Sequence, residues 1–172
     1  MKKLIVIATI TLALCISAAA QYTSVYTSTK TTGCRTLESH PDEAGWYRGR
    51  CKGVGGYALE LTEGDLRQDL IVITPAKKKH DLQLTSYYPR FSSVGEKVEW
   101  RVKGGLPVAL ISRYNVSTDD NGGTISYLMV SKIGKKESCV VDVIMPGKDQ
   151  NVDARKSADA AARKPCKTMA LD

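Results

Sequence analysis

The chain has 172 residues, with 25 lysines and arginines against 18 acidic residues and a net charge of +7 at pH 7. This length suits one domain with a hydrophobic core of its own, and charges of both signs are spread along most of the chain. The chain has two histidines, no C-x-x-C pair and no basic cluster interleaved with aromatic residues, which argues against zinc, redox and nucleic-acid functions.

The first twenty residues have the form of a secretory signal peptide. Lys2 and Lys3 precede an apolar run over residues 4–16, which is too short to span a bilayer, and residues 17–21 (Ser-Ala-Ala-Ala-Gln) provide a small-residue cleavage site. We therefore expect residues 1–20 to be removed and the mature chain to be periplasmic or secreted, without a transmembrane segment. Removing both lysines leaves 23 basic and 18 acidic residues, a net charge of +5, which favours encounters with anionic surfaces.

The mature chain is predicted to be one domain built from short strands. Residues 21–33, rich in threonine and serine, are expected to form an exposed arm or a first edge strand, and residues 34–172 a single disulfide-stapled domain. Turn signals rich in glycine, proline and asparagine separate short apolar runs. The runs expected to be strands cover residues 57–62, 70–73, 82–86, 97–103, 108–115, 125–133 and 139–144. We predict a mainly β fold, an antiparallel meander that forms a small barrel or sandwich.

Alternation with period two is clearest in residues 97–103. Val98, Trp100 and Val102 occupy every second position there, and every intervening residue is charged. The pattern predicts that the apolar set faces the core and that the charged set faces water. The uninterrupted apolar run over residues 70–73 instead favours a strand that is buried on both faces.

One short helix is expected at the C-terminus, over about residues 149–164. Alanines are frequent there, Asp159 lies four residues before Arg163, and Pro165 follows. Because its apolar face consists of alanines and Val152, such a helix would pack shallowly against the sheet.

The cysteines that follow the signal peptide are expected to form disulfides. Cys34, Cys51, Cys139 and Cys166 allow three pairings, and we favour Cys34 with Cys51 and Cys139 with Cys166. The second of these bonds would pin the weakly packed helix to the sheet. Each closure is expected to contribute about 3 kcal/mol.

The two histidines are interpreted as structural or solvated residues. His40 lies among the carboxylates of residues 38–43, a composition typical of a polar turn, although it could also hold a cation weakly or supply a base. His80 follows Lys77, Lys78 and Lys79, and we expect a solvated histidine after a solvated basic turn. No metal and no cofactor are expected, and no motif for a serine nucleophile occurs.

Two segments combine aromatic and basic residues in a way that suits binding. Residues 45–57 contain Trp46, Arg48 and Arg50 among glycines, and residues 87–91 are Tyr-Tyr-Pro-Arg-Phe. Tryptophan, tyrosine and arginine concentrate binding energy at interfaces. Alternation places Trp46, Arg48 and Arg50 on one face, which is expected to be exposed because unpaired arginine is rarely buried. The candidate binding residues are Trp46, Arg48, Arg50, Tyr87, Tyr88 and Arg90; the alternative is a structural strand with Trp46 in the core.

These features favour an exported, non-enzymatic binding or interaction domain of the bacterial envelope, with an anionic polymer, a glycan or a protein as its partner. A cell-envelope hydrolase that uses carboxylates, and a structural envelope component, are the alternatives. An inhibitor of host lysozyme would suit the size and the disulfides. It is disfavoured because lysozymes are commonly cationic and would repel this chain.

Overall fold

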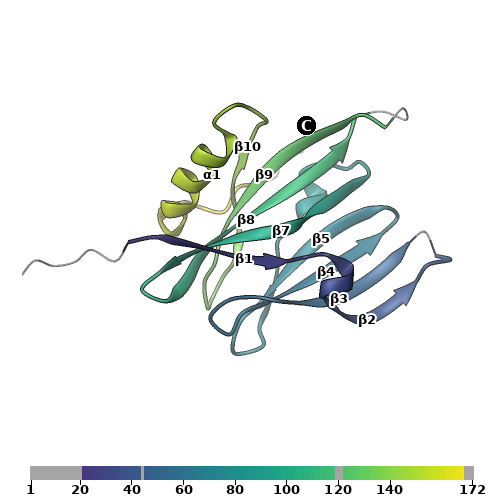
Figure 1. Ribbon diagram of the computed structural model, residues 1–172, viewed down its shortest axis with the longest axis horizontal. Coiled ribbons are helices and arrows are strands. Elements are labelled where there is room, and N and C mark those ends of the chain that lie inside the picture. The colour runs from purple at the N-terminus through teal and green to yellow at the C-terminus, as the bar shows by residue number, and fades with distance from the viewer. Residues whose placement is uncertain (1–20, 44, 119–121, 169–172) are drawn as a thin grey trace, which may run out of the picture.

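The structure is a computed structural model that describes residues 21–43, 45–118 and 122–168, so the predicted signal peptide lies outside the described residues. Within these ranges, ten strands form one sheet and one α-helix follows them (Figure 1). The strands are β1 (Thr23–Ser28), β2 (Arg35–His40), β3 (Trp46–Lys52), β4 (Ala58–Gly64), β5 (Arg67–Ile73), β6 (Lys79–Asp81), β7 (Ser92–Lys103), β8 (Leu106–Ser117), β9 (Thr124–Lys132) and β10 (Cys139–Ile144). The helix is α1 (Gln150–Asp159), and three short 3-10 turns are η1 (Thr31–Gly33), η2 (Leu84–Ser86) and η3 (Ala161–Arg163).

The sheet consists of two antiparallel meanders joined at one point. The strand order is β10-β9-β8-β7-β5-β4-β3-β2, with β1 beside β7 and β6 beside β5. The junction between β5 and β7 is parallel and pairs Arg67 with Ser92. β1 then pairs antiparallel with β7 along residues 97–102. The mainly β prediction is confirmed, but the order has β10 and β2 at its two ends, so the sheet is not a closed barrel.

Both meanders contribute to one main core. Tryptophan, tyrosine and leucine side chains from β4, β5, β7 and β8 are fully buried in a single apolar cluster. The largest of these strand side chains are Trp100, Tyr114, Leu59, Leu61, Leu70 and Leu110. The period-two pattern therefore selects the inner face of the strands correctly on both sides of the junction.

Helix α1 covers the other face of β8, β9 and β10. Ala154 and Ala158 of α1 are buried there, together with Ala161 of η3, at the spacing that places side chains on one side of a helix. They pack against a second cluster that includes Ile111 and Val130. Because alanine side chains are small, the helix approaches the sheet closely but buries little apolar area of its own.

Glu99 and Arg101 of β7 do not face water as expected. The apolar set of this strand is buried as predicted, but these two charged residues are also buried, with 8% exposure each. Arg155 of α1 binds Glu99, and Asp159 of α1 accepts two bonds from Arg101, at 2.7 and 2.9 Å. The covering helix lies more than fifty residues later in the chain, so local alternation could not reveal it.

Residues 82–86 do not form the predicted strand. β6 ends at Asp81, and the next residues turn into η2. Gln83 adopts a left-handed conformation with φ of 53°, and the Asp69 carboxylate accepts the N–H groups of two η2 residues. A carboxylate that caps backbone donors stabilises a turn over an extended chain, which overrides the apolar pattern here.

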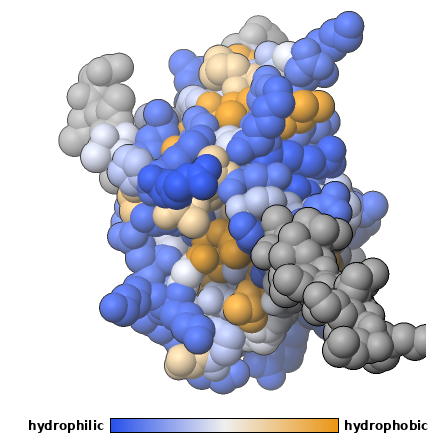
Figure 2. Space-filling view, turned by 90° about the vertical axis from the view of Figure 1, so that its left-hand side faces the viewer, coloured by the Kyte–Doolittle hydropathy of each residue, from blue (hydrophilic) through white to orange (hydrophobic). Residues whose placement is uncertain are grey.

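The outer surface is mostly hydrophilic. Figure 2 shows polar side chains over most of the face seen from the left of Figure 1, with apolar residues in small separate groups. The large exposed apolar side chains are scattered over several elements; they are Val25, Tyr26, Leu66, Phe91, Leu106, Ile125, Met145 and Val152. Because scattered apolar residues are ordinary on a protein surface, the charged surfaces are the better candidates for a functional site.

Candidate functional site

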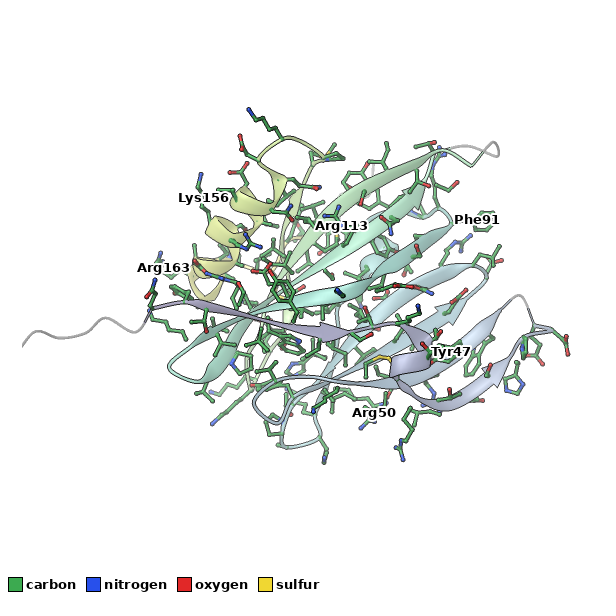
Figure 3. All side chains as sticks on the ribbon, viewed as in Figure 1. Tyr47, Arg50, Phe91, Arg113, Lys156 and Arg163 are labelled. Atoms are coloured by element: carbon green, nitrogen blue, oxygen red, sulfur yellow. A yellow bond between two sulfur atoms is a disulfide. The ribbon has the colours of Figure 1, made fainter. Side chains whose placement is uncertain are left out.

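Strand β3 places its aromatic and basic residues on the face expected from alternation. Tyr47 packs against the main core, whereas Trp46, Arg48 and Arg50 lie on the opposite, outer face and are partly exposed (Tyr47 and Arg50 are labelled in Figure 3). The Trp46 ring lies 5.4 Å from the His40 ring of β2, measured between centroids. The three predicted residues of this segment therefore share one surface.

A buried carboxylate organises this surface. Glu60 of β4 lies opposite Arg50 of the neighbouring strand β3, and the Glu60 side chain is 1% exposed. Lys79 Nζ of β6 donates to both carboxylate oxygens at 3.0 Å, and Arg50 Nη2 donates to Oε2 at 3.3 Å. Arg48 Nη1 lies 3.7 Å from Oε1. We call Glu60, Arg48, Arg50 and Lys79 the Glu60 cluster.

The Glu60 cluster carries an excess of positive charge. Burial tends to raise the pKa of Glu60, but the hydrogen bonds and charges of Lys79, Arg50 and Arg48 outweigh it, and the pKa lies below its ordinary value. Glu60 is therefore ionised at neutral pH. Glu38 of β2 binds Arg48 at 2.9 Å and offsets a second cation. One positive charge is left uncompensated, and exposed Lys52 follows on the same face of β3.

The two arginines of the cluster keep unused donor capacity. Their Nε groups are buried and have no hydrogen-bond partner within the described part of the chain. A ligand cannot reach these buried atoms, but the two arginine side chains are 37% and 32% exposed, so their remaining N–H groups are the ones that an oxygen-rich ligand on the outer face can contact. A guanidinium fork fits the paired oxygens of carboxylate, sulfate or phosphate groups.

The Glu60→Gln variant is expected to lose about 2 kcal/mol of stability at neutral pH, because three cations would lose their shared carboxylate. We expect a smaller loss of stability than for a fully buried ion pair because the cations are partly exposed to solvent. Since the folded-state pKa is lowered, the stabilisation is present above the unfolded-state value of 4.5 and disappears as the pH falls through the folded-state pKa. Urea unfolding of both forms should therefore show a gap at neutral pH that closes in acid.

Glu38→Gln is the matched control for this prediction. Glu38 also binds Arg48, but its side chain is 42% exposed, so its loss should cost less than about 0.5 kcal/mol. A Glu60→Gln variant that is as stable as Glu38→Gln at neutral pH would contradict the assigned role of the buried carboxylate.

The remaining predicted binding residues lie away from this face. Tyr88 stacks on Tyr127 with ring centroids 4.3 Å apart, and Arg90 Nη1 donates to the Thr118 carbonyl at 2.6 Å. Burial, followed by the neighbouring Tyr127, raises the pKa of Tyr88 to about 12. Tyr88 and Arg90 both line a surface pocket of about 330 Å³ that also includes Ile125. This pocket is formed by apolar and neutral groups for the most part, with Arg90 tied to the backbone.

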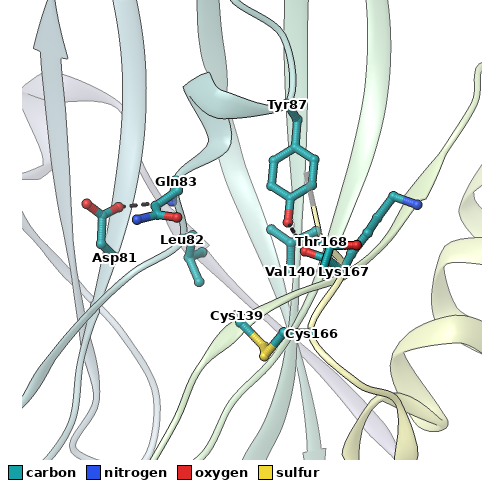
Figure 4. A pocket seen from close by; sticks show the side chains of 9 residues that line it. All are labelled: Asp81, Leu82, Gln83, Tyr87, Cys139, Val140, Cys166, Lys167 and Thr168. Carbon is teal, nitrogen blue, oxygen red and sulfur yellow. Dashed lines mark hydrogen bonds between the residues drawn. A yellow bond between two sulfur atoms is a disulfide. The ribbon is translucent and has the colours of Figure 1, made fainter. Parts of the chain in front are cut away.

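Tyr87 points into a different pocket, although it is adjacent to Tyr88 in the sequence. Its hydroxyl donates to the Lys167 carbonyl at 2.8 Å, beside the Cys139–Cys166 disulfide (Figure 4). This pocket has a volume of about 360 Å³. The six predicted residues thus occupy three places, and neither pocket is lined by a residue of β3.

The cysteines form the two predicted disulfides, Cys34–Cys51 and Cys139–Cys166. Among the described residues, Glu137, Cys139 and Cys166 form a group with the spacing of metal ligands. Both of these cysteines are oxidised in the disulfide, so their sulfur atoms are not thiolate ligands.

His80 is buried rather than solvated, which corrects the sequence-based expectation. It is 9% exposed, and its Nδ1 lies 3.0 Å from the Ser138 hydroxyl oxygen. Burial, followed by the charge of Lys78, lowers its pKa. Glu60 and Lys79 were not among the binding residues predicted from the sequence. The signal for Glu60 was a lone carboxylate between two buried leucines, in a strand that alternates.

No family of known proteins matches this chain, nor does any curated protein or solved structure. In the part of the chain that the structure describes, no helix has the length and apolar character needed to cross a membrane. The functional conclusion therefore rests on the geometry of the β3 face.

Proposed function

We propose that this protein is an exported, non-enzymatic binding domain of the bacterial envelope and that the outer face of β3 binds an anionic partner. The observation that carries the proposal is the gathering of Arg48, Arg50 and Lys79 around one buried carboxylate, with Trp46 beside them. The cations supply charge and hydrogen-bond donors, and the indole supplies an apolar surface on which a sugar ring can pack.

An exported location agrees with the signal-peptide pattern and with both disulfides, which persist in oxidising compartments such as the periplasm or the medium. We also propose that the two meanders form an open sandwich. In that arrangement the main core lies between them, and the outer face of β3 is left available to a partner.

Binding is favoured over hydrolysis on this face because of how its carboxylates are held. A glycoside hydrolase needs one carboxylic acid whose pKa is raised, so that it can protonate the leaving group. Glu60 is enclosed by cations and its pKa is lowered, and Glu38 is ion-paired with Arg48. Neither carboxylate has the environment of a general acid.

The proposal predicts that dextran sulfate binds to the protein and that uncharged dextran of the same length does not. A Trp46→Ala, Arg48→Gln, Arg50→Gln variant should bind dextran sulfate at least about tenfold more weakly, because two charge-assisted contacts at a partly exposed site are lost. Isothermal titration calorimetry measures the affinity, and thermal unfolding confirms that the variant is folded. Capture from envelope extract with both forms would then identify the natural partner.

A Lys97→Gln, Lys156→Gln variant is the matched control. Both lysines are exposed, and Lys156 lies on α1, away from Arg50 (Figure 3). This control removes the same amount of charge and should bind as the wild type does. If the wild type fails to bind dextran sulfate, or if the control loses as much affinity as the β3 variant, the proposed function is wrong.

A further inference from the structure

Two lysine runs that are far apart in the sequence meet at one end of the sheet. The turn between β5 and β6 carries Lys77 and Lys78, and the turn between β9 and β10 carries Lys135 and Lys136; all four are exposed. Lys78 Nζ donates to the Lys136 carbonyl at 2.7 Å. The contact between His80 and Ser138, two residues further along each run, joins the same two turns from the buried side.

This paired-turn surface adjoins the Glu60 cluster along the chain. Lys79 is the link, because it follows Lys78 directly and its Nζ binds Glu60. Two acids lie beside this surface. Glu137 is held by Lys132 at 2.7 Å, an ion pair that lowers its pKa, and exposed Asp81, two residues after Lys79 on β6, accepts a bond from the Gln83 N–H. We call the whole surface the basic band; it consists of Arg48, Arg50, Lys52, Lys79, Lys78, Lys77, Lys135 and Lys136.

The band is longer than a single anion. From β3 to β6 it crosses three strand spacings, which is about 14 Å at the usual separation of neighbouring strands. The paired turns extend it beyond β6. A phosphate or sulfate ion would contact one part of this surface, whereas a chain with repeated negative charges would contact both ends at once and gain from multivalency.

Lys77 occupies a backbone conformation that favours glycine. Its φ is +66°, in a tight hairpin turn where Lys77 N–H donates to the Thr74 carbonyl at 2.9 Å. Glycine adopts this left-handed conformation freely, but a side chain there costs about 1 kcal/mol. Replacing Lys77 with glycine would therefore remove one charge of the turn and relieve its backbone strain, so this variant separates an effect of charge from an effect of stability.

We propose that the ligand of the basic band is an extended anionic polysaccharide that reaches from the Glu60 cluster to the paired turns. This inference rests on the proposed function and specifies its ligand. Lysines recognise such a chain as point charges that are spaced along it. A nucleic acid is disfavoured because single-stranded binders stack successive bases on several exposed rings, and Trp46 is the aromatic side chain beside the cluster.

Chain length provides the test. A Lys135→Gln, Lys136→Gln variant should bind long dextran sulfate about tenfold more weakly, through two lost ion pairs, and bind a short sulfated oligosaccharide as the wild type does. Lys77→Gly should also weaken binding of the long chain, while its stability in urea equals or exceeds that of the wild type. Inorganic sulfate should compete poorly with the long chain.

The outcomes separate this inference from the proposed function. If the Lys135→Gln, Lys136→Gln variant binds the long chain normally while the β3 variant does not bind it, the proposed contact along the basic band is wrong and the proposed β3 site is supported. If both variants bind normally, both proposals are wrong. An equal loss of affinity in the Lys97→Gln, Lys156→Gln control would show a general effect of charge and would overturn the proposed contact along the basic band. Tighter binding of single-stranded DNA than of dextran sulfate at matched charge would overturn the choice of a polysaccharide.

Discussion

Replacing Trp100 with alanine is expected to lower the free energy of unfolding by about 4 kcal/mol, the cost of truncating a large aromatic side chain in a core. Trp100 is fully buried within the cluster that both meanders share. Its indole Nε1 donates to the Thr27 hydroxyl of β1 at 2.8 Å. The truncation would therefore leave a cavity in this shared cluster and also remove a contact that holds β1 against β7.

The other tryptophan of the chain provides the control. Trp46 is partly exposed on the outer face, so Trp46→Ala should cost less than about 1.5 kcal/mol. Trp100→Phe keeps most of the ring volume and should cost about 1–2 kcal/mol, through the lost hydrogen bond and a smaller cavity. Urea unfolding followed by circular dichroism measures all three variants. Equal losses for Trp46→Ala and Trp100→Ala would contradict the assignment of the core.

Strand positions could be predicted from the sequence because the period of two is a local property. The predicted strand over residues 139–144 coincides with β10, and the alternating segment 97–103 lies inside β7. Burial of the outer face could not be predicted in the same way. Glu99 and Arg101 are covered by α1 and β1, and that cover depends on contacts between distant parts of the chain.

The candidate site was predictable only within one strand. Alternation placed Trp46, Arg48 and Arg50 on a common face, and the paired strands show that they share it. Glu60 and Lys79 join them through the packing of β4 and β6, which no spacing in the sequence encodes. Conversely, Tyr87 and Tyr88 are adjacent in the sequence but point into separate pockets, because the chain leaves η2 in a turn rather than in a strand.

Removing the Cys139–Cys166 disulfide is expected to lower the free energy of unfolding by about 3–4 kcal/mol. The bond joins residues 27 positions apart, and a loop of this size confines the unfolded chain by about that amount in the chain-entropy description. The Cys139→Ala, Cys166→Ala variant, compared with the wild type in urea without reductant, measures the loss. The Cys34→Ala, Cys51→Ala variant should lose about 3 kcal/mol, because its loop spans 17 positions.

The sequence predicts that the Cys139–Cys166 disulfide pins the helix to the sheet. We expect that removing this bond loosens the C-terminal segment instead of α1. Helix α1 is also held by its buried alanines and by two ion pairs, in which Arg101 donates to Asp159 and Arg155 donates to Glu99. The Cys139→Ala, Cys166→Ala variant should therefore keep slow hydrogen exchange along α1 and lose protection at Lys167, whose N–H bonds to the Val140 carbonyl. Fast exchange along α1 in this variant, with slow exchange in the Cys34→Ala, Cys51→Ala variant, would show that the disulfide and not the ion pairs holds the helix on the sheet.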